Sequence, residues 1–273
     1  MRLLRVIPLA ALFLVGACDE DGVVRNSSLP PLAFIRYVNA VPDAGALDFK
    51  FIDAIEFSPS YANSPFRTVG IYQGARAGSR SVKVFRNSSD ITVTQQVITT
   101  ATLNLVAGTY YTILHSGYVT AANGPVQSLV LLNDTRPAQN TGLHVGAVNT
   151  AMGLPAQDFF ATATTTTTLV GATPIFTGLV GGARSATYAA RATGAFAVQA
   201  AATTTTTSTA AAGAAAGFAG TTLVDPVGGH SVAGTQFSAF LFPASIPGSG
   251  APTFASPGIT LVVDRQPART VPD

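Results

Sequence analysis

Short segments in which hydrophobic and polar residues alternate recur along the chain. Residues 33–39, 47–52 and 81–85 show this pattern or are rich in branched and aromatic side chains, and so are residues 110–114 and 127–132. Turn-forming residues separate the segments about every 8–12 residues. No helical period of useful length is present. The pattern predicts an all-β protein built from many short strands.

The residues between these segments complete the first half of the chain. We expect a strand at 66–72, a turn at 74–78 and a polar hairpin tip at 87–90. The β-branched run Ile91-Thr92-Val93-Thr94 predicts another strand. Later in the chain, residues 238–242 and 259–263 are expected to form the closing strands.

The same motifs return in the same order more than 100 residues later. Asn39 recurs as Asn149, and Asp48-Phe49 recurs as Asp158-Phe159, both at an offset of 110. Later blocks match at growing offsets: Val106–Thr109 with Val232–Thr235, and Asp134 with Asp264. A repeat this long indicates duplicated domains, because solenoid repeats have periods of about 20–50 residues.

These patterns predict two tandem Ig-like β-sandwich domains, at residues 32–140 and 142–271. The second domain diverges from the first, since Met152-Gly153 replaces the turn residues Pro42-Asp43 and the turn is expected to be lost. The Thr and Ala runs at 164–168, 203–207 and 210–216 are interpreted as surface-loop insertions. Extension of neighbouring strands by Thr and a short helical turn of Ala are the alternatives.

The N-terminus has the organisation of an export signal. A basic stretch, Met1–Arg5, precedes an apolar stretch, Val6–Leu14, that is too short to cross a bilayer. Val15-Gly16-Ala17-Cys18 then resembles the bacterial lipobox, which implies a signal peptide at 1–17 and lipidation of Cys18. The stretch at 18–31 has no apolar period and is expected to be a flexible tether. The expected location is the cell envelope, anchored by lipid to a membrane and facing the periplasm or the cell surface. The alternative is an ordinary secretory signal in which Cys18 is incidental.

Composition narrows the range of partners. The formal net charge is +2, and without Arg2 and Arg5 of the leader 13 basic residues balance 13 acidic ones. The basic residues are also scattered, so no nucleic-acid partner is expected. Cys18 is the only cysteine, which excludes an intramolecular disulfide and a cysteine-based metal site.

The residues that could carry chemistry are few and scattered. His115, His144 and His230 lack metal-ligand spacing and are interpreted as strand or turn residues. Ser231 lies in Gly229–Ala233, which resembles a nucleophile elbow with Ala in place of the last Gly. No catalytic residue, metal site or cofactor is therefore predicted.

Two pairs of carboxylates recur between the repeats. Asp48 recurs as Asp158 and Asp134 as Asp264. None of them stands in a clustered loop of the kind that calcium requires. We expect all four to cap strand ends and turns by accepting hydrogen bonds from backbone amides.

Part of the first repeat resembles a known bacterial family, the domain of unknown function DUF4397. The resemblance rests on residues 36–44 with Leu47-Asp48-Phe49, on Val106–Thr112, and on residues 129–137. The Pro-Asp-Ala turn and the Gly-Thr-Tyr-Tyr-Thr hairpin are its most specific parts. The resemblance implies an exported, often duplicated, all-β domain, and it brings no activity or site residues.

The sequence therefore predicts a non-catalytic envelope lipoprotein. The two modules would bind a protein or glycan partner or fill a structural role, and the membrane would be contacted through the lipid anchor. The alternative is an envelope hydrolase acting on glycans or esters, which would need a cluster such as His230, Ser231 and an Asp.

Overall fold

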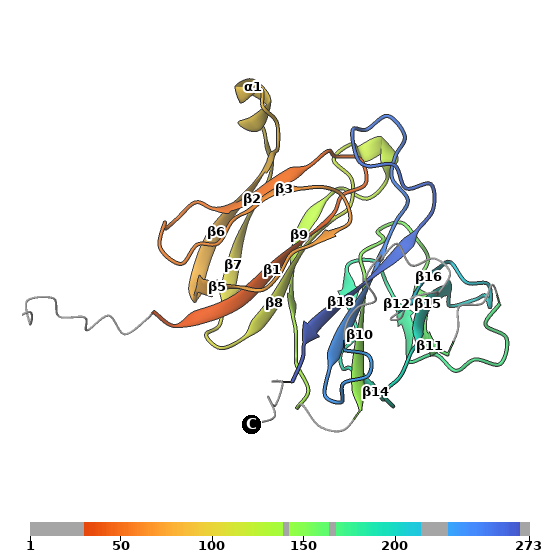
Figure 1. Ribbon diagram of the computed structural model, residues 1–273. Coiled ribbons are helices and arrows are strands. Elements are labelled where there is room, and N and C mark those ends of the chain that lie inside the picture. The colour runs from red at the N-terminus through yellow and green to blue at the C-terminus, as the bar shows by residue number, and fades with distance from the viewer. Residues whose placement is uncertain (1–29, 139–141, 164–167, 214–228, 268–273) are drawn as a thin grey trace, which may run out of the picture. The chain divides into compact units, whose positions relative to one another are not determined.

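A computed structural model describes residues 30–138, 142–163, 168–213 and 229–267, and strands dominate them (Figure 1). The described residues from Pro31 onward belong to one compact unit. The predicted signal peptide, Cys18 and nearly all of the predicted tether lie outside the described residues. In the described part of the chain, no helix is long and apolar enough to cross a membrane.

The first half of the chain forms two sheets that face each other, which we call the first sandwich. One sheet has the order β4-β1-β8-β9, with β5 also paired to β1, and the other has the order β3-β2-β6-β7. The strands are β1 (Leu32–Ala40), β2 (Leu47–Phe51), β3 (Tyr61–Ser64), β4 (Thr68–Val69), β5 (Gln73–Arg76), β6 (Gly78–Arg86), β7 (Val97–Leu105), β8 (Tyr110–Ser116) and β9 (Ser128–Asn133).

The second half forms another pair of sheets, the second sandwich. Its sheets have the orders β13-β10-β17-β18, with β14 paired to β10, and β12-β11-β15-β16. Each strand order repeats that of the first sandwich nine places later. The strands are β10 (Leu143–Asn149), β11 (Gln157–Thr162), β12 (Phe176–Leu179), β13 (Ala183–Arg184), β14 (Ala189–Arg191), β15 (Ala197–Ala202), β16 (Ala210–Gly213), β17 (Gln236–Phe242) and β18 (Gly258–Arg265).

One sheet of each sandwich is buried on both faces. In β1, Ile35 and Tyr37 point into the core of the first sandwich, whereas Val38 and Ala40 point the other way. Those two residues join a separate apolar cluster that contains Phe240 of β17. The sheets that contain β1 and β10 therefore pack against each other, and we call this contact the junction.

Both sandwiches bury the alternating side chains that the sequence pattern marks as apolar. The first core centres on residues such as Phe49, Val84 and Ile113, all fully buried. The second centres on Phe159, Phe196 and Phe237, also fully buried. The prediction of an all-β fold of sandwich type is confirmed.

Three local predictions in the first sandwich are wrong. The expected strand at Ile91–Thr94 is a short helix, α1, because the side chain of Asp90 accepts a hydrogen bond from the Thr92 amide and caps it. The expected strand at 66–72 is interrupted, with β4 covering only Thr68–Val69. The expected turn at 74–78 instead contains most of β5, which pairs with β1.

Two predictions in the second sandwich also need correction. The Ala run does not lie wholly in a loop, because β16 (Ala210–Gly213) pairs with β15 and buries Ala212 in the core. The turn at Met152-Gly153 is retained, with Gly153 at a φ of 91° that suits glycine. Thr203 and Thr204 form a turn, as a loop insertion would, and Thr207 bridges to Thr168. Residues 164–167 and 214–216 lie outside the described ranges.

Candidate functional site

A cluster of four charged residues is buried at the junction. It consists of Arg36 on β1, Asp134 just after β9, Arg184 on β13 and Asp264 on β18, and we call it the junction cluster. Each side chain is at most 6% exposed. Two positive charges are thus buried with two negative charges, which avoids the cost of burying an unpaired ion.

Arg36 connects the two sandwiches. Its Nη1 donates a hydrogen bond to Oδ1 of Asp264 at 2.5 Å, and its Nε donates to Oγ1 of Thr112 at 2.8 Å. The guanidinium lies between the rings of Tyr72 and Phe240, 4.5 and 4.9 Å from their centroids. A side chain from the first sandwich is therefore held by a carboxylate and an aromatic ring of the second.

The two carboxylates have matching surroundings. Asp134 accepts hydrogen bonds from the Tyr72 hydroxyl at 2.5 Å and the Thr112 hydroxyl at 2.7 Å. It also accepts one from Nη1 of Arg184, which reaches across from the second sandwich. Arg36 and Arg184 therefore cross the junction in opposite directions, each to the other sandwich's carboxylate.

Asp264 repeats this arrangement in the second sandwich. It accepts hydrogen bonds from the Tyr188 hydroxyl at 2.7 Å and the Ser238 hydroxyl at 2.5 Å, in addition to the bond from Arg36. Burial alone would raise the pKa of Asp264, but Arg36 and the two hydroxyl donors outweigh burial and hold it below its ordinary value. Asp264 is therefore ionised at neutral pH.

The prediction for the recurring carboxylates is correct for one pair and wrong for the other. Asp48 accepts from the Asn63 amide at 2.8 Å, and Asp158 accepts from the Gly178 amide at 2.7 Å, as expected of capping residues. The two carboxylates of the junction cluster instead accept from side chains. They are buried by the packing of one sandwich on the other, which the repeat pattern alone does not reveal.

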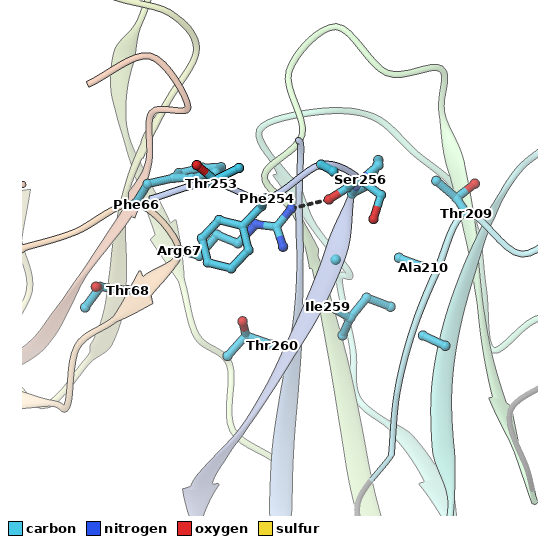
Figure 2. A pocket seen from close by; sticks show the side chains of 14 residues that line it. Phe66, Arg67, Thr68, Thr209, Ala210, Thr253, Phe254, Ser256, Ile259 and Thr260 are labelled. Atoms are coloured by element: carbon cyan, nitrogen blue, oxygen red, sulfur yellow. Dashed lines mark hydrogen bonds between the residues drawn. The ribbon is translucent and has the colours of Figure 1, made fainter. Parts of the chain in front are cut away.

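A cleft of about 640 Å³ opens beside the junction (Figure 2). Its walls come from the residues around β4, from the start of β16 and from the segment that leads into β18. Five of its lining residues carry hydroxyl groups: Thr68, Thr209, Thr253, Ser256 and Thr260. In Figure 2, Thr209 and Ala210 lie across the cleft from Arg67 and Phe254.

Among the described residues that line this cleft, Arg67 alone is charged. Its Nη2 donates to the backbone carbonyls of Pro243 at 2.7 Å and Ser256 at 2.5 Å. The guanidinium stacks on the Phe254 ring, 4.1 Å from its centroid. In the part of the chain that the structure describes, no acidic side chain is within ion-pair distance of it, and burial lowers the pKa of Arg67 to about 10.

A second cleft, of about 430 Å³, borders the junction cluster. Arg36, Tyr72, Tyr110 and Arg136 all contribute to its lining. The Arg136 guanidinium covers the Tyr110 ring at 3.5 Å, and that ring stacks on Phe34 at 4.6 Å. The stacking surfaces of Arg136, Tyr110 and Phe34 are therefore already occupied by one another.

His115 lies on β8, in keeping with the expectation of a strand or turn residue, and it is fully buried. Its Nδ1 lies 2.9 Å from the Tyr37 hydroxyl, and its Nε2 contacts Oε1 of Gln127. Because the amide nitrogen of Gln127 donates to the Ile98 carbonyl, Oε1 must accept from Nε2, and Nδ1 must accept from Tyr37. Burial lowers the pKa of His115 to about 4, so the ring is neutral at physiological pH.

The other candidate residues lie on β10 and in the turn that precedes β17. His144 is buried on β10, whereas Ser231 is exposed in the turn that precedes β17. His230 lies in the same turn, and its Nδ1 is buried without a hydrogen-bond partner. Within the described ranges, no group of three or more His, Cys, Asp or Glu side chains could hold a metal ion.

The fold and these clefts define a class: an all-β protein of two packed sandwiches with buried charge between them. Residues 33–160 match the family model of DUF4397, described as a domain of unknown function. This match confirms the resemblance to the family that the sequence analysis inferred for the first repeat. The match begins in β1 and ends in β11, so it continues past the first sandwich. A comparison with curated proteins found no match.

Proposed function

We propose that the protein is a non-catalytic binding lipoprotein of the cell envelope. Lipid on Cys18 anchors it to a membrane, and the tether at 18–31 presents the two sandwiches as one binding unit. Its partner is a protein or a glycan, and the larger cleft is the binding site.

One observation carries this proposal: among the described residues, no carboxylate pairs with the guanidinium of Arg67 in the larger cleft. A half-buried guanidinium bonded only to carbonyl groups is costly to maintain, because desolvation is not offset by an ion pair. Such a residue gains most from a ligand that supplies acceptors. The cleft volume also falls within the range of about 300–1,000 Å³ that is typical of ligand sites.

The junction supports a binding role because it fixes the walls of the cleft. Arg67 belongs to the first sandwich, and Thr209 and Ser256 belong to the second. The ion pairs and aromatic contacts at the junction hold these residues in one geometry. A preorganised site loses less conformational entropy when a ligand binds.

Binding is tested with the full-length protein, purified in detergent, against panels of envelope glycans and peptides. We expect at least one ligand to bind. Ala211→Leu, which puts a larger side chain at the cleft, should weaken the binding of that ligand. Empty panels would contradict the proposal.

Anchoring is tested separately by growing cells with radiolabelled palmitate. The wild-type protein is expected to incorporate label and to fractionate with membranes, and Cys18→Ala is expected to do neither. If the two proteins incorporate label and fractionate alike, the proposal of a lipid anchor on Cys18 is contradicted. Digestion of the protein by protease added to intact cells distinguishes the cell surface from the periplasm.

A further inference from the structure

We propose that the cleft at Arg67 selects a saccharide that carries a carboxylate. The inference rests on the proposed binding function and adds the chemical class of the ligand. It identifies Arg67 as the residue that determines specificity. Three features of the cleft carry it: an uncompensated charge, a backbone arranged around that charge, and walls rich in hydroxyl groups.

The first feature is the charge itself. Within the described ranges, the Arg67 guanidinium donates both of its hydrogen bonds from Nη2, and both acceptors are neutral carbonyl oxygens, of Pro243 and Ser256. By contrast, Arg36 and Arg184 at the junction are each paired with a carboxylate. A ligand carboxylate at Arg67 would supply the missing charge, and a guanidinium binds carboxylates in a planar, bidentate geometry.

The second feature is the backbone around Arg67. The residue has a φ of 70°, a left-handed conformation that costs a non-glycine residue energy and often marks a functional site. Opposite it, Gly258 has no side chain, and a Cβ there would lie 2.5 Å from Nη1 of Arg67. Phe254 covers one face of the guanidinium. Gly258 and Phe254 thus make room for the guanidinium, although no carboxylate in the described part of the chain forms an ion pair with it.

The third feature is the chemistry of the walls. The hydroxyl groups of Thr68, Thr209, Thr253, Ser256 and Thr260 can each donate and accept a hydrogen bond. A saccharide offers the same mixture of donors and acceptors around its ring. Because Arg67 is the only charged residue in the described part of the lining, one acidic group per ligand is favoured over a densely charged polymer segment.

The experiment measures binding of the full-length protein in detergent by calorimetry. The probes are short oligomers of galacturonate, of alginate and of hyaluronan, each compared with a neutral oligosaccharide of the same length. We expect at least one acidic oligomer to bind at least about 10-fold more tightly than its neutral counterpart. Replacement of Arg67 by Gln should weaken that binding about 10- to 100-fold, the usual effect of losing hydrogen bonds to a charged group.

Two further variants separate the role of Arg67 from a general loss of structure. Arg76→Gln removes an exposed arginine of the same sandwich and should leave binding unchanged. Ala211→Leu should reduce binding by filling part of the cleft while Arg67 remains. Each variant is first required to unfold thermally like the wild type. If Arg67→Gln fails this requirement, Arg67→Lys, which keeps the charge but not the bidentate geometry, is used instead and should still weaken binding.

The inference is overturned if acidic and neutral oligomers bind with equal affinity or if no acidic oligomer binds. It is also overturned if Arg67→Gln leaves the affinity for the acidic oligomer unchanged. Tighter binding of a short aspartate-rich peptide than of any acidic saccharide would also overturn it. A different ligand that binds independently of Arg67 would contradict this inference and leave the proposed binding function standing. Failure of every ligand class would contradict both.

Discussion

At the scale of single residues, Arg36 shows how burial changes the role of a side chain. The sequence places it between Ile35 and Tyr37, so alternation assigns Arg36 to the polar, solvent-facing side of the strand and gives no reason to expect its burial. Its partner Asp264 lies 228 positions later, and the two meet only because the two sandwiches pack together. The recurrence of Asp134 and Asp264 was a usable signal for this cluster, whereas nothing in the sequence indicated Arg36 or Arg67.

Removing the charge of Asp264 should destabilise the protein strongly. Asp264→Asn leaves Arg36 buried without its closest counter-ion, and breaking one partner of a buried pair costs roughly 3–5 kcal/mol. Urea unfolding measures this change as a lower midpoint. Arg36→Met in the same chain should recover part of the loss, because the buried charge is then removed as well.

The matched control for Asp264→Asn is an exposed ion pair. Nζ of Lys50 lies 3.8 Å from Oδ2 of Asp48, and the Lys50 side chain is 49% exposed. Because exposed ion pairs contribute little, Lys50→Gln should change the free energy of unfolding by less than about 1 kcal/mol. Equal effects of the two substitutions would contradict the account of the junction cluster.

His115 should make stability depend on pH in a defined window. In the folded protein the pKa of His115 is about 4, below its ordinary value of 6.5. Between pH 4 and 6.5 the unfolded chain therefore binds more protons than the native one. Stability should therefore fall as the pH is lowered from 6.5 to 4, by roughly 3 kcal/mol from this residue.

Comparison with a variant isolates that contribution. Asp264 has a folded pKa below its ordinary value of 3.8, so the stability that it supplies is lost only at lower pH. In His115→Gln the loss of stability between pH 6.5 and 4 should become smaller by about the same amount. An unchanged pH profile of the unfolding free energy would show that His115 is not buried as a neutral ring.

At the scale of elements, alternation predicted the strands that carry long side chains. β1, β2, β6, β8 and β9 were all located within a few residues. The alternation pattern failed where helix capping or burial determined the conformation instead. Capping by Asp90 made a helix of a β-branched run, and burial made a strand of the Ala run, whose small side chains carry little hydrophobic signal.

Gly146 on β10 illustrates how one element accommodates the junction. A Cβ at this position would lie 3.1 to 3.3 Å from the ring of Tyr188, which donates to Asp264. Gly146→Ala should displace that ring and lower the free energy of unfolding by about 1–3 kcal/mol, as overpacking does. Gly45→Ala is the control, because its Cβ would meet only one atom at an ordinary 3.5 Å. Equal melting temperatures of the two variants would contradict the close packing of Tyr188 on β10.

At the scale of the whole molecule, the sequence predicted two sandwiches but not their packing. Alternation marks which residues of a strand are apolar, yet β10 and β17 are buried on both faces and read as nearly continuous apolar runs. Those runs were the signal for a second interface. The cleft at Arg67 could not be predicted, because its walls come from both sandwiches and from loops.

The central claim is that the two sandwiches form one unit whose junction builds the cleft, and calorimetry of the full-length protein tests it most directly. A single cooperative unit should unfold in one transition, with equal calorimetric and van 't Hoff enthalpies. The junction cluster predicts that Asp264→Asn shifts this whole transition downward. Two separate transitions in the wild-type protein, with Asp264→Asn affecting only one of them, would contradict the account.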